Sequence, residues 1–192
     1  EVQALRAGSQ AVLVGGQTMV ADNPRLTNRL GQGGQPWAVV VTHRLPAPDA
    51  DLFLLQARPQ ELIFVTSREC SASEAAHRLR EAGVAVWGVP DQEEGLDMKK
   101  ALQRLYLKLG CTELLCEGGG RLGMSLIQAE VVDELHMVLG PKVLGDVQGV
   151  SVLSGRTALS MDQALSWRLI SHEPVGGDLW LAIEDMAGCN GR

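Results

Sequence analysis

The sequence lacks the residue patterns of a metal site or a disulfide-bonded scaffold. It has four cysteines and four histidines, with no C-x-x-C pair and no spacing typical of zinc ligands. The cysteines are Cys70, Cys111, Cys116 and Cys189. Free thiols are typical of a reducing compartment, so we expect a cytoplasmic protein, or one of the plastid stroma in a plant, without a bound metal.

Positive charge and long apolar runs are also scarce. Lysine and arginine together number 17 against 23 aspartates and glutamates, which gives a net charge of −6. Binding of a nucleic-acid duplex through counterion release needs a broad basic face, so we expect no nucleic-acid partner. No stretch approaches the roughly 20 apolar residues that span a bilayer, and the first residues do not form a signal peptide, so we expect no membrane partner.

Hydrophobic residues make up 45% of the 192 residues, enough for the core of one ordinary domain. Short apolar runs with the composition of buried strands alternate with amphipathic stretches. The runs are 11–15, 37–41, 61–67, 84–89 and 112–118. This alternation predicts an α/β fold of three layers, in which helices cover both faces of a mainly parallel central sheet.

Two stretches carry the clearest helix signals. In 71–83, Ser71 and Glu74 have the spacing of a capping box, which predicts a helix that begins there. The stretch 97–109 carries one apolar stripe and is followed by Gly110, a residue typical of a helix C-terminus.

The C-terminal part departs from the alternation of strand and helix. Residues 131–145 form a long apolar strand region, and 167–185 reads as two strands that turn through Gly176 and Gly177. We therefore predict an antiparallel C-terminal hairpin. At the other end, the first ten residues have the pattern of the second half of an amphipathic helix without an initiating cap, so we expect that preceding chain is missing.

A glycine-rich run, EGGGRLG at 117–123, leaves two interpretations open. Gly118, Gly120 and Gly123 match G-x-G-x-x-G, and the helix expected to follow would present free N–H groups to a phosphate. The same glycines would equally suit a sharp turn between buried elements. A Rossmann site is disfavoured, because its fingerprint belongs to the first βα turn, with an acidic residue about 20 positions later.

A second unusual stretch, GGQTMVADNPRLTNR at 15–29, follows the first apolar run. Loops at the carboxyl ends of parallel strands hold ligands in open α/β sheets. Taken singly, Asp22 is better interpreted as a cap or turn residue, and each arginine as a solvated charge. Together, Arg6, Arg25 and Arg29 bring several guanidinium groups into one neighbourhood, which suits bidentate phosphate binding.

Other candidate residues are poorer. Asp133, Glu134 and His136 lie on an expected strand, where neighbours point to opposite faces, so a solvated face explains them better than acid–base chemistry. Cys116 lies in an apolar run without a histidine nearby in the sequence, so packing is favoured over nucleophilic catalysis. Neither G-x-S-x-G nor a Walker lysine is present.

In combination, two long stretches resemble the reductase domain of the riboflavin-biosynthesis deaminase/reductase family. They are LRAGSQAVLVGGQTMVADNPRLTNR at 5–29 and LLCEGGGRLGMSLIQAEVVDELHMVLGPKVLG at 114–145. The resemblance spans nearly the whole chain and implies a dihydrofolate-reductase-like fold, NADPH as hydride donor and a phosphorylated ribosylaminopyrimidine as substrate. The implied reaction reduces 5-amino-6-(5-phosphoribosylamino)uracil to the 5-phosphoribitylamino compound, with hydride delivered to C1′ of the opened ribosyl imine.

The resemblance also implies roles for individual residues. It places at the cofactor Thr18, Asp22, Thr42, His43, Arg44, Gly119, Gly120, Arg121, Leu122, Gly123, Met124 and Ser125. It places at the substrate Arg6, Leu26, Arg29 and Glu117, with the arginines at the 5′-phosphate. Glu117 is the first candidate for a catalytic carboxylate and Asp22 the second. The family has Asp-Ser where this chain has Thr42 and His43, so Arg44 becomes the candidate for the cofactor's 2′-phosphate.

On this interpretation residues 1–192 are a single reductase domain, truncated at its N-terminus. The family's first strand has no counterpart before Glu1, so we expect a sheet that lacks an inner strand and a chain that is poorly stable or inactive alone. We also expect a disordered tail at 186–192 and a homodimer formed through the apolar strand near 131–140. The zinc signature of the family's deaminase is absent here, so we do not expect deamination from this chain, although such a domain could precede it in the native polypeptide.

Two other functions stay open. One is a reductase of the same fold that acts on the 2,5-diaminopyrimidine before deamination, or on a pterin. The other is a non-catalytic nucleotide-binding or dimerisation module that keeps only the scaffold. Binding of NADPH would separate the module from either enzyme, and turnover of the two pyrimidines would separate the enzymes.

Overall fold

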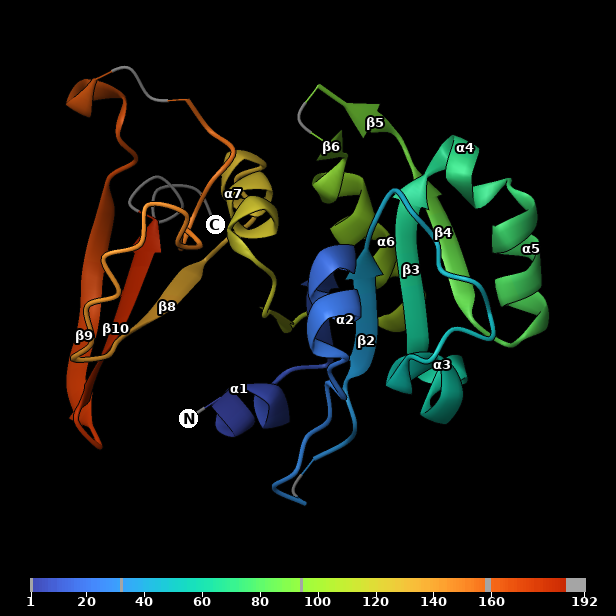
Figure 1. Ribbon diagram of the computed structural model, residues 1–192, viewed down its shortest axis with the longest axis horizontal. Coiled ribbons are helices and arrows are strands. Elements are labelled where there is room, and N and C mark those ends of the chain that lie inside the picture. The colour runs from blue at the N-terminus through green and yellow to red at the C-terminus, as the bar shows by residue number, and fades with distance from the viewer. Residues whose placement is uncertain (1, 32, 94, 158–159, 186–192) are drawn as a thin grey trace.

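A five-stranded parallel sheet forms the centre of the computed structural model, which describes residues 2–31, 33–93, 95–157 and 160–185 (Figure 1). The tail 186–192, for which the sequence predicts disorder, lies outside these ranges. In spatial order the strands are β4 Ala85–Val89, β3 Leu62–Ser67, β2 Trp37–Val41, β1 Ala11–Gly15 and β7 Leu114–Cys116. Every neighbouring pair is parallel, so the mainly parallel central sheet is confirmed.

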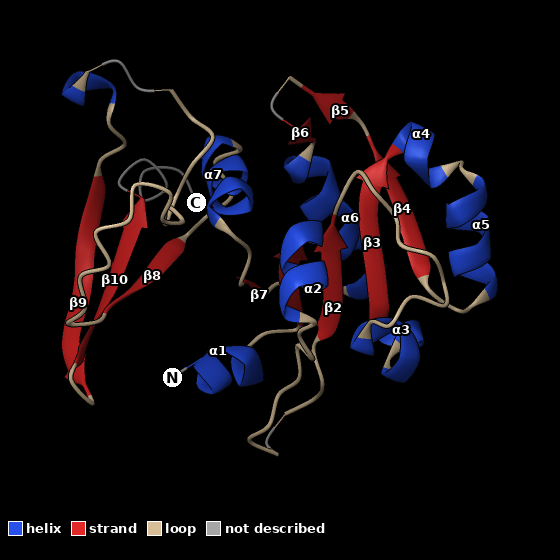
Figure 2. Cartoon of the chain, viewed as in Figure 1, coloured by secondary structure: helices blue, strands red, loops and turns tan. Residues whose placement is uncertain are grey.

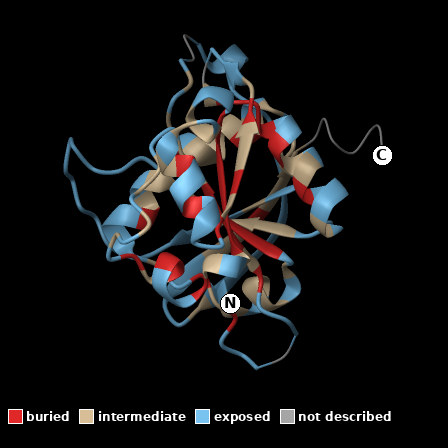
Figure 3. Cartoon of the chain, turned by 90° about the vertical axis from the view of Figure 1, so that its right-hand side faces the viewer, coloured by how far each residue is buried: buried red, intermediate tan, exposed pale blue. Residues whose placement is uncertain are grey.

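Helices cover both faces of this sheet. They are α1 Val2–Gly8, α2 Gly16–Asp22, α3 Phe53–Ala57, α4 Arg68–Ser71, α5 Glu74–Glu81, α6 Met98–Leu109 and α7 Gly120–Gln128, with short 3-10 turns η1 Pro59–Glu61 and η2 Met161–Gln163. Val12 and Phe64 enter a core with residues of α2, α3 and α5. Leu13 and Ile63 point the other way, into a core with residues of α6 and α7. Hydrophobic burial on both faces therefore stabilises the expected three layers (Figure 3).

A separate antiparallel sheet forms in the C-terminal part (Figure 2). Its strands, in spatial order, are β8 Glu134–Leu139, β10 Asp178–Asp185 and β9 Trp167–Val175. The turn between β9 and β10 passes through Gly176 and Gly177 with φ angles of 65° and 112°, which glycine adopts at little steric cost. The predicted hairpin is therefore confirmed. The ribbon of β5 Asp91–Gln92 and β6 Gly95–Leu96 is an element that the sequence did not lead us to expect.

The two larger sheets do not join into one. Among the described residues, β7 pairs only with β1 and β8 pairs only with β10, so each strand has one unpaired edge. Helix α7 lies between the two sheets in Figure 2. All three residues of β7 are only partly buried, whereas the first four of β1 are buried. The lack of an inner strand that the sequence led us to expect stays a prediction.

The stretch after β1, which we interpreted as a ligand loop, begins as helix α2. The helix follows Gly15, which has an extended backbone, and ends at Asn23, which has a left-handed φ of 42°. Met19 is 2% exposed and belongs to the first core. Burial of this one apolar side chain favours a helix in spite of the small and polar residues around it, because tertiary packing overrides local propensity.

The predicted capping box at Ser71 is wrong. The chain divides here into α4, which ends at Ser71, and α5, which begins at Glu74. The cap of α5 is Ser73, whose hydroxyl accepts a hydrogen bond from the Ala76 N–H at 3.3 Å. A serine two residues further along therefore takes the role, because the backbone turns between the two helices.

The limits of α6 agree with the sequence. Asp97 caps it, because its Oδ1 accepts a hydrogen bond from the Lys100 N–H at 3.0 Å, and Gly110 ends it with a left-handed φ of 64°. Asp97 is 7% exposed. The hydrogen bond from the Lys100 backbone holds the pKa of Asp97 below its ordinary value, although burial acts in the opposite direction.

We predict that the Asp97 cap gives the protein an acid-sensitive share of its stability. A pKa lowered in the folded state stabilises above the unfolded value, about 3.9, and this contribution is lost as the pH falls through the folded value. Asp97→Ala should therefore lower the free energy of unfolding by about 1 kcal/mol at neutral pH, and the difference from wild type should shrink below about pH 4. Urea unfolding at several pH values measures both effects.

Asp97→Asn is the matched control, because it keeps an oxygen that can accept the Lys100 N–H but cannot titrate. It should retain most of the stability at neutral pH without the acid-dependent loss. An Asp97→Ala variant whose difference from wild type is the same at pH 7 and pH 3 would contradict the prediction.

Candidate active site

A cleft of about 810 Å³ opens at the carboxyl edge of the parallel sheet. Segments that follow β1, β2 and β7 line it, together with the β5–β6 ribbon and a loop near 150–154. Because parallel strands end at the same edge of a sheet, segments far apart in the sequence meet here. The lining residues are Gly15, Gly16, Gln17, Thr18, Ala21, Asp22, Val41, Thr42, His43, Gly95, Leu96, Met98, Gly119, Gly120, Arg121, Leu122, Ser125, Val150, Ser151 and Ser154.

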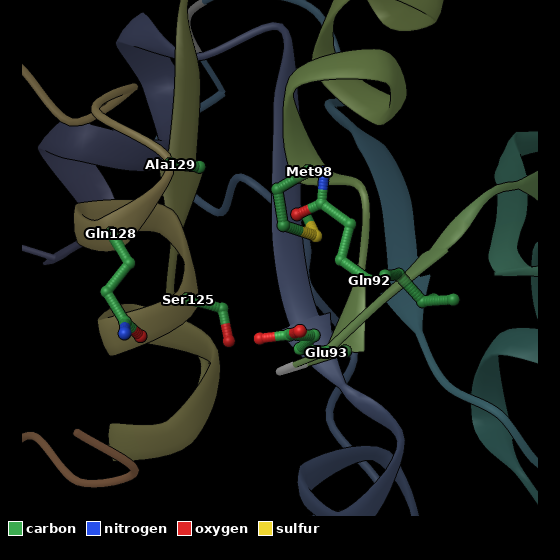
Figure 4. Close-up of a pocket in the computed structure, with 8 residues that line it drawn as sticks. Gln92, Glu93, Met98, Ser125, Gln128 and Ala129 are labelled. Atoms are coloured by element: carbon green, nitrogen blue, oxygen red, sulfur yellow. The ribbon is translucent and has the colours of Figure 1, made fainter. Parts of the chain in front are cut away.

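A smaller pocket of about 400 Å³ adjoins this cleft and shares four lining residues with it, Gly95, Leu96, Met98 and Ser125. It lies between α7 and the β5–β6 ribbon (Figure 4). In that view the Ser125 hydroxyl and the Glu93 carboxylate point toward one another from the two elements. The wider cavity is therefore lined by polar groups at this end as well.

The start of α7 forms one wall of the cleft. Gly119 is its extended N-cap residue, and an α-helix leaves its first N–H groups without partners inside the helix. A Cβ at Gly120 would lie 2.7 Å from the Ser151 carbonyl oxygen and 2.9 Å from that of Val152. The Ser154 N–H also donates to the Gly120 carbonyl at 3.2 Å. Glycine at 120 thus allows the 151–154 loop to pack directly on the helix terminus.

Arg6 and Glu117 form a bidentate ion pair beside this wall. The Arg6 Nε and Nη2 donate to the two carboxylate oxygens of Glu117, each at 2.6 Å, and Nη1 donates to the Thr27 carbonyl at 3.3 Å. The two side chains are 12% and 21% exposed. The hydrogen bonds to Glu117 raise the pKa of Arg6 above its ordinary value, although burial lowers it. The two parallel hydrogen bonds therefore hold both side chains in one fixed orientation.

The backbone fixes the place of Glu117 as well. Its N–H donates to the Leu13 carbonyl at 2.9 Å, which continues the pairing of β7 with β1 by one residue. The carboxylate thus stands where the strand ends and the glycines begin. Only Gly118 separates Glu117 from Gly119, the N-cap of α7. A ligand group bound by Glu117 would therefore lie near a group bound by the first N–H groups of α7.

The structure brings most of the expected cofactor residues together. All of them except Arg44, Gly123 and Met124 line the large cleft. Arg44 directly follows Thr42 and His43, which both line the cleft. The Thr42 hydroxyl accepts a hydrogen bond from the Arg44 N–H and donates one to the Arg44 carbonyl, each at 3.0 Å. His43 is held by Asp91, with Nε2 and Oδ1 2.9 Å apart.

The structure joins only two of the four expected substrate residues directly. Arg6 and Glu117 are joined as described, whereas Leu26 is 1% exposed and belongs to the core of the sheet. Arg29 is exposed, and its N–H donates to the Gln3 side chain on α1 at 2.9 Å. Among the described residues that line the large cleft, none belongs to this substrate group.

Some residues that line the cleft were not predicted from the sequence. Ser151 and Ser154 come from a segment without a recognisable motif, and Gly95 comes from the unanticipated ribbon. Their position depends on tertiary packing, above all on the contact of the 151–154 loop with Gly120. No local pattern in the sequence would have identified them.

The poorer candidates have ordinary structural surroundings. Cys116 packs against the second core, and burial raises the pKa of its thiol above the ordinary value. Glu134 and His136 form a surface pair with 3.2 Å between Oε2 and Nε2. Within the described residues, no cluster of His, Cys, Asp or Glu could hold a metal, and no helix is long and apolar enough to cross a membrane.

The fold, a parallel sheet followed by a C-terminal antiparallel sheet, is shared with solved RibD proteins and with a pyrimidine reductase-like protein of Corynebacterium diphtheriae. The chain belongs to the family described as the RibD C-terminal domain, whose sequence model matches residues 1–181. It is 38% identical to the riboflavin biosynthesis protein RibD of Chlamydia muridarum, over all of this chain and 50% of that protein. It is 29% identical to the 2,5-diamino-6-ribosylamino-4(3H)-pyrimidinone 5′-phosphate reductase of Aquifex aeolicus, over 91% of this chain and 76% of that protein.

Solved structures agree on the fold. RibD of Acinetobacter baumannii superposes with a TM-score of 0.78 at 24% identity, over 95% of this chain and 49% of that one. The riboflavin biosynthesis reductase Rib7 of Saccharomyces cerevisiae superposes with a TM-score of 0.67 at 20% identity, over 95% of this chain and 78% of that one. The chain spans about half the length of the RibD proteins that it matches.

We predict that Gly120→Ala weakens the binding of a nicotinamide dinucleotide in the cleft by at least about tenfold, or 1.4 kcal/mol. The new Cβ would force the 151–154 loop or the helix terminus to move, since the obstructing atoms are backbone carbonyls. Fluorescence titration of NADPH measures the affinity. Gly34→Ala is the control, because its Cβ would meet nothing within 4 Å and the residue lies outside the cleft. Equal affinities of the two variants would show that the contact at Gly120 does not shape the site.

Proposed function

We propose that the chain reduces 5-amino-6-(5-phosphoribosylamino)uracil to the 5-phosphoribitylamino compound with NADPH, a step of riboflavin biosynthesis. One observation carries the proposal. The segment Glu117–Ser125 joins a carboxylate held by Arg6 to the glycine-rich start of α7 in the cleft. A group suited to a sugar and amide donors suited to a diphosphate therefore lie on one continuous segment.

The cleft has the size and donor chemistry that a dinucleotide needs. Its volume of about 810 Å³ lies within the range of ligand sites, roughly 300–1,000 Å³. The N–H groups at the start of α7 favour the diphosphate, because the helix N-terminus carries partial positive charge. Thr18 and Asp22 of α2 line the same cleft and are proposed to contact the cofactor. When bound, NADPH supplies the hydride.

The Arg6–Glu117 pair is proposed to meet the ribosyl part of the substrate. Because Arg6 grips both carboxylate oxygens, Glu117 is oriented before the substrate arrives, which reduces the ordering needed on binding. The carboxylate can accept hydrogen bonds from ribose hydroxyls and assist proton transfer at the imine. Arg29 is the better arginine for the 5′-phosphate, since the Arg6 guanidinium already holds a carboxylate.

A reductase of the 2,5-diaminopyrimidine is the second candidate. The relatives from Aquifex aeolicus and Archaeoglobus fulgidus are named for that substrate, at 29% and 33% identity. The two pyrimidines differ at one ring position and share the ribosyl phosphate, so Arg6, Arg29 and Glu117 would serve either. The choice therefore depends on contacts with the base.

The partners and location follow from the relatives in the same way. We propose a deaminase domain in the native polypeptide, because the matched RibD proteins are about twice the length of this chain. Exposed apolar side chains on the second sheet, Val138, Leu139, Leu169 and Ile170, support a homodimer. A relative from Arabidopsis thaliana is named chloroplastic, which supports a plastid location if this chain comes from a plant.

Oxidation of NADPH in the presence of each pyrimidine tests the proposed reaction directly. Turnover of the amino-oxo compound with a higher kcat/KM than that of the diamino compound would support the proposal, and it would overturn the expectation from the sequence that the chain is inactive alone. The reverse preference would make the second candidate correct. Binding of NADPH without turnover of either substrate would instead support the non-catalytic module.

We predict that Glu117→Gln lowers kcat by about a hundredfold, the usual contribution of a group that assists proton transfer. The uncharged amide also removes the bidentate ion pair with Arg6, so KM for the pyrimidine should rise. Steady-state kinetics measures both parameters. Glu74→Gln is the matched control, because it breaks the exposed Glu74–Arg78 pair on α5, away from the cleft. Unchanged turnover and substrate affinity in Glu117→Gln would remove Glu117 from the mechanism.

We predict that Arg44 sets the preference for NADPH over NADH. Loss of one charge-assisted contact with the 2′-phosphate costs about tenfold in affinity, or 1.4 kcal/mol. Arg44→Ala should therefore reduce kcat/KM for NADPH by about that factor and leave kcat/KM for NADH unchanged. Kinetics with both cofactors gives the ratio. A parallel loss with NADH would mean that Arg44 acts on the fold of the 42–44 turn and not on the phosphate.

A further inference from the structure

Arg58 is a buried guanidinium that neither lines the cleft nor belongs to any motif of the sequence. It lies between α3 and η1 and is 9% exposed. Its Nε donates to the Glu61 carboxylate at 2.6 Å. A guanidinium stays charged in proteins and has five donors in a fixed plane, so its burial requires that several acceptors be arranged around it.

Three of those acceptors are backbone carbonyls at the two ends of one loop, which we call the 23–36 loop. Nη1 donates to the carbonyls of Arg25 and Leu26 at 3.2 and 3.1 Å, and Nη2 donates to that of Pro36 at 2.6 Å. One side chain thus connects the start of the loop to its end. Neither end can move away without leaving a charged donor unsatisfied.

The loop needs such a restraint because Leu26 has a left-handed backbone, with a φ of 48°. Residues other than glycine rarely adopt this conformation and keep it only where the surroundings hold them there. The Leu26 side chain is 1% exposed in the first core, and its carbonyl is bound by Arg58. The residue is therefore fixed by packing on one side and by charge on the other.

The next carbonyl along the loop is bound from the opposite direction. The Thr27 carbonyl accepts a hydrogen bond from Nη1 of Arg6, the same guanidinium that grips Glu117. Adjacent peptide groups of the loop thus connect a buried arginine to the arginine of the candidate site. A shift of the Leu26 carbonyl would be passed to Arg6 through one peptide unit.

We propose that Arg58 is a positioning residue for substrate binding. It fixes the first turn of the 23–36 loop, so that Arg6, Glu117 and Arg29 are in place for the phosphorylated ribosyl group. It does not touch the substrate itself. This inference rests on the proposed function for its substrate, but the restraint on the loop can be measured independently.

A purely structural role would give a different result, and Arg80 provides the comparison. Its Nη2 also donates to two backbone carbonyls, Ser71 at 2.8 Å and Val86 at 2.9 Å, beside the outer strand β4. Arg80→Met removes a similar set of bonds away from the loop. Arg58→Met removes the charge of Arg58, and Arg58→Lys keeps the charge but cannot reach the same acceptors in one plane.

The test combines kinetics with hydrogen exchange on the full chain. The N–H groups of Asn28, Arg29 and Leu30 donate to side-chain acceptors within the loop or on α1, so their exchange reports on the loop. In both Arg58 variants we expect exchange at these amides to quicken by about tenfold or more. KM for 5-amino-6-(5-phosphoribosylamino)uracil should rise by about the same factor, while the Kd of NADPH stays within about twofold of wild type.

Arg80→Met should lower the thermal midpoint without changing any of these three quantities. The proposal is wrong if the Arg58 variants leave the exchange rates unchanged, or raise KM no more than Arg80→Met does. Should Arg58→Met fail to fold, Arg58→Lys decides alone. If wild type does not bind the pyrimidine, the proposed function fails, and exchange at the three amides still decides whether Arg58 restrains the loop.

Discussion

Parallel pairing of β1 with β2 on one side and β7 on the other is the constraint on which the rest of the structure depends. Because these strands run the same way, their carboxyl ends meet at one edge of the sheet. The segments that follow them provide α2, the Thr42–Arg44 turn and the Glu117–Gly119 segment. The cleft is thus a result of strand direction, and each segment contributes only a few side chains or amides to it.

Features with a complete local pattern could be predicted from the sequence. The helix α6 is one, since its cap at Asp97, its apolar stripe and its stop at Gly110 all lie within one stretch. The hairpin through Gly176 and Gly177 is another. The helix α2 could not be predicted, because what stabilises it is the burial of Met19 in a core that also draws on β2, β3 and α3, which come later in the chain. The choice of Ser73 over Ser71 as a cap likewise depends on how two short helices meet.

In the candidate site, too, residues within a local motif could be predicted, and residues placed by long-range contacts could not. Glu117 and the glycines after it could be identified because a motif carries them, and the cleft contains most of the residues expected at a cofactor. The ion pair of Glu117 with Arg6 could not be foreseen, because 111 positions separate the partners. Arg58 is the clearest example of a residue whose role the sequence does not reveal. A lone arginine in a sequence reads as a solvated surface charge, and only the fold shows three carbonyls and a carboxylate around it.

The unpaired edge of β7 has a consequence for ligand affinity. The strand β7, which ends just before Glu117, is paired on one side only, by β1, although it leads directly into Glu117 and the start of α7. A segment that paired with this edge would contact the same strand whose end positions Glu117. If that pairing and a ligand at Glu117 favour the same arrangement of the strand, thermodynamic linkage requires that each strengthen the other by an equal factor.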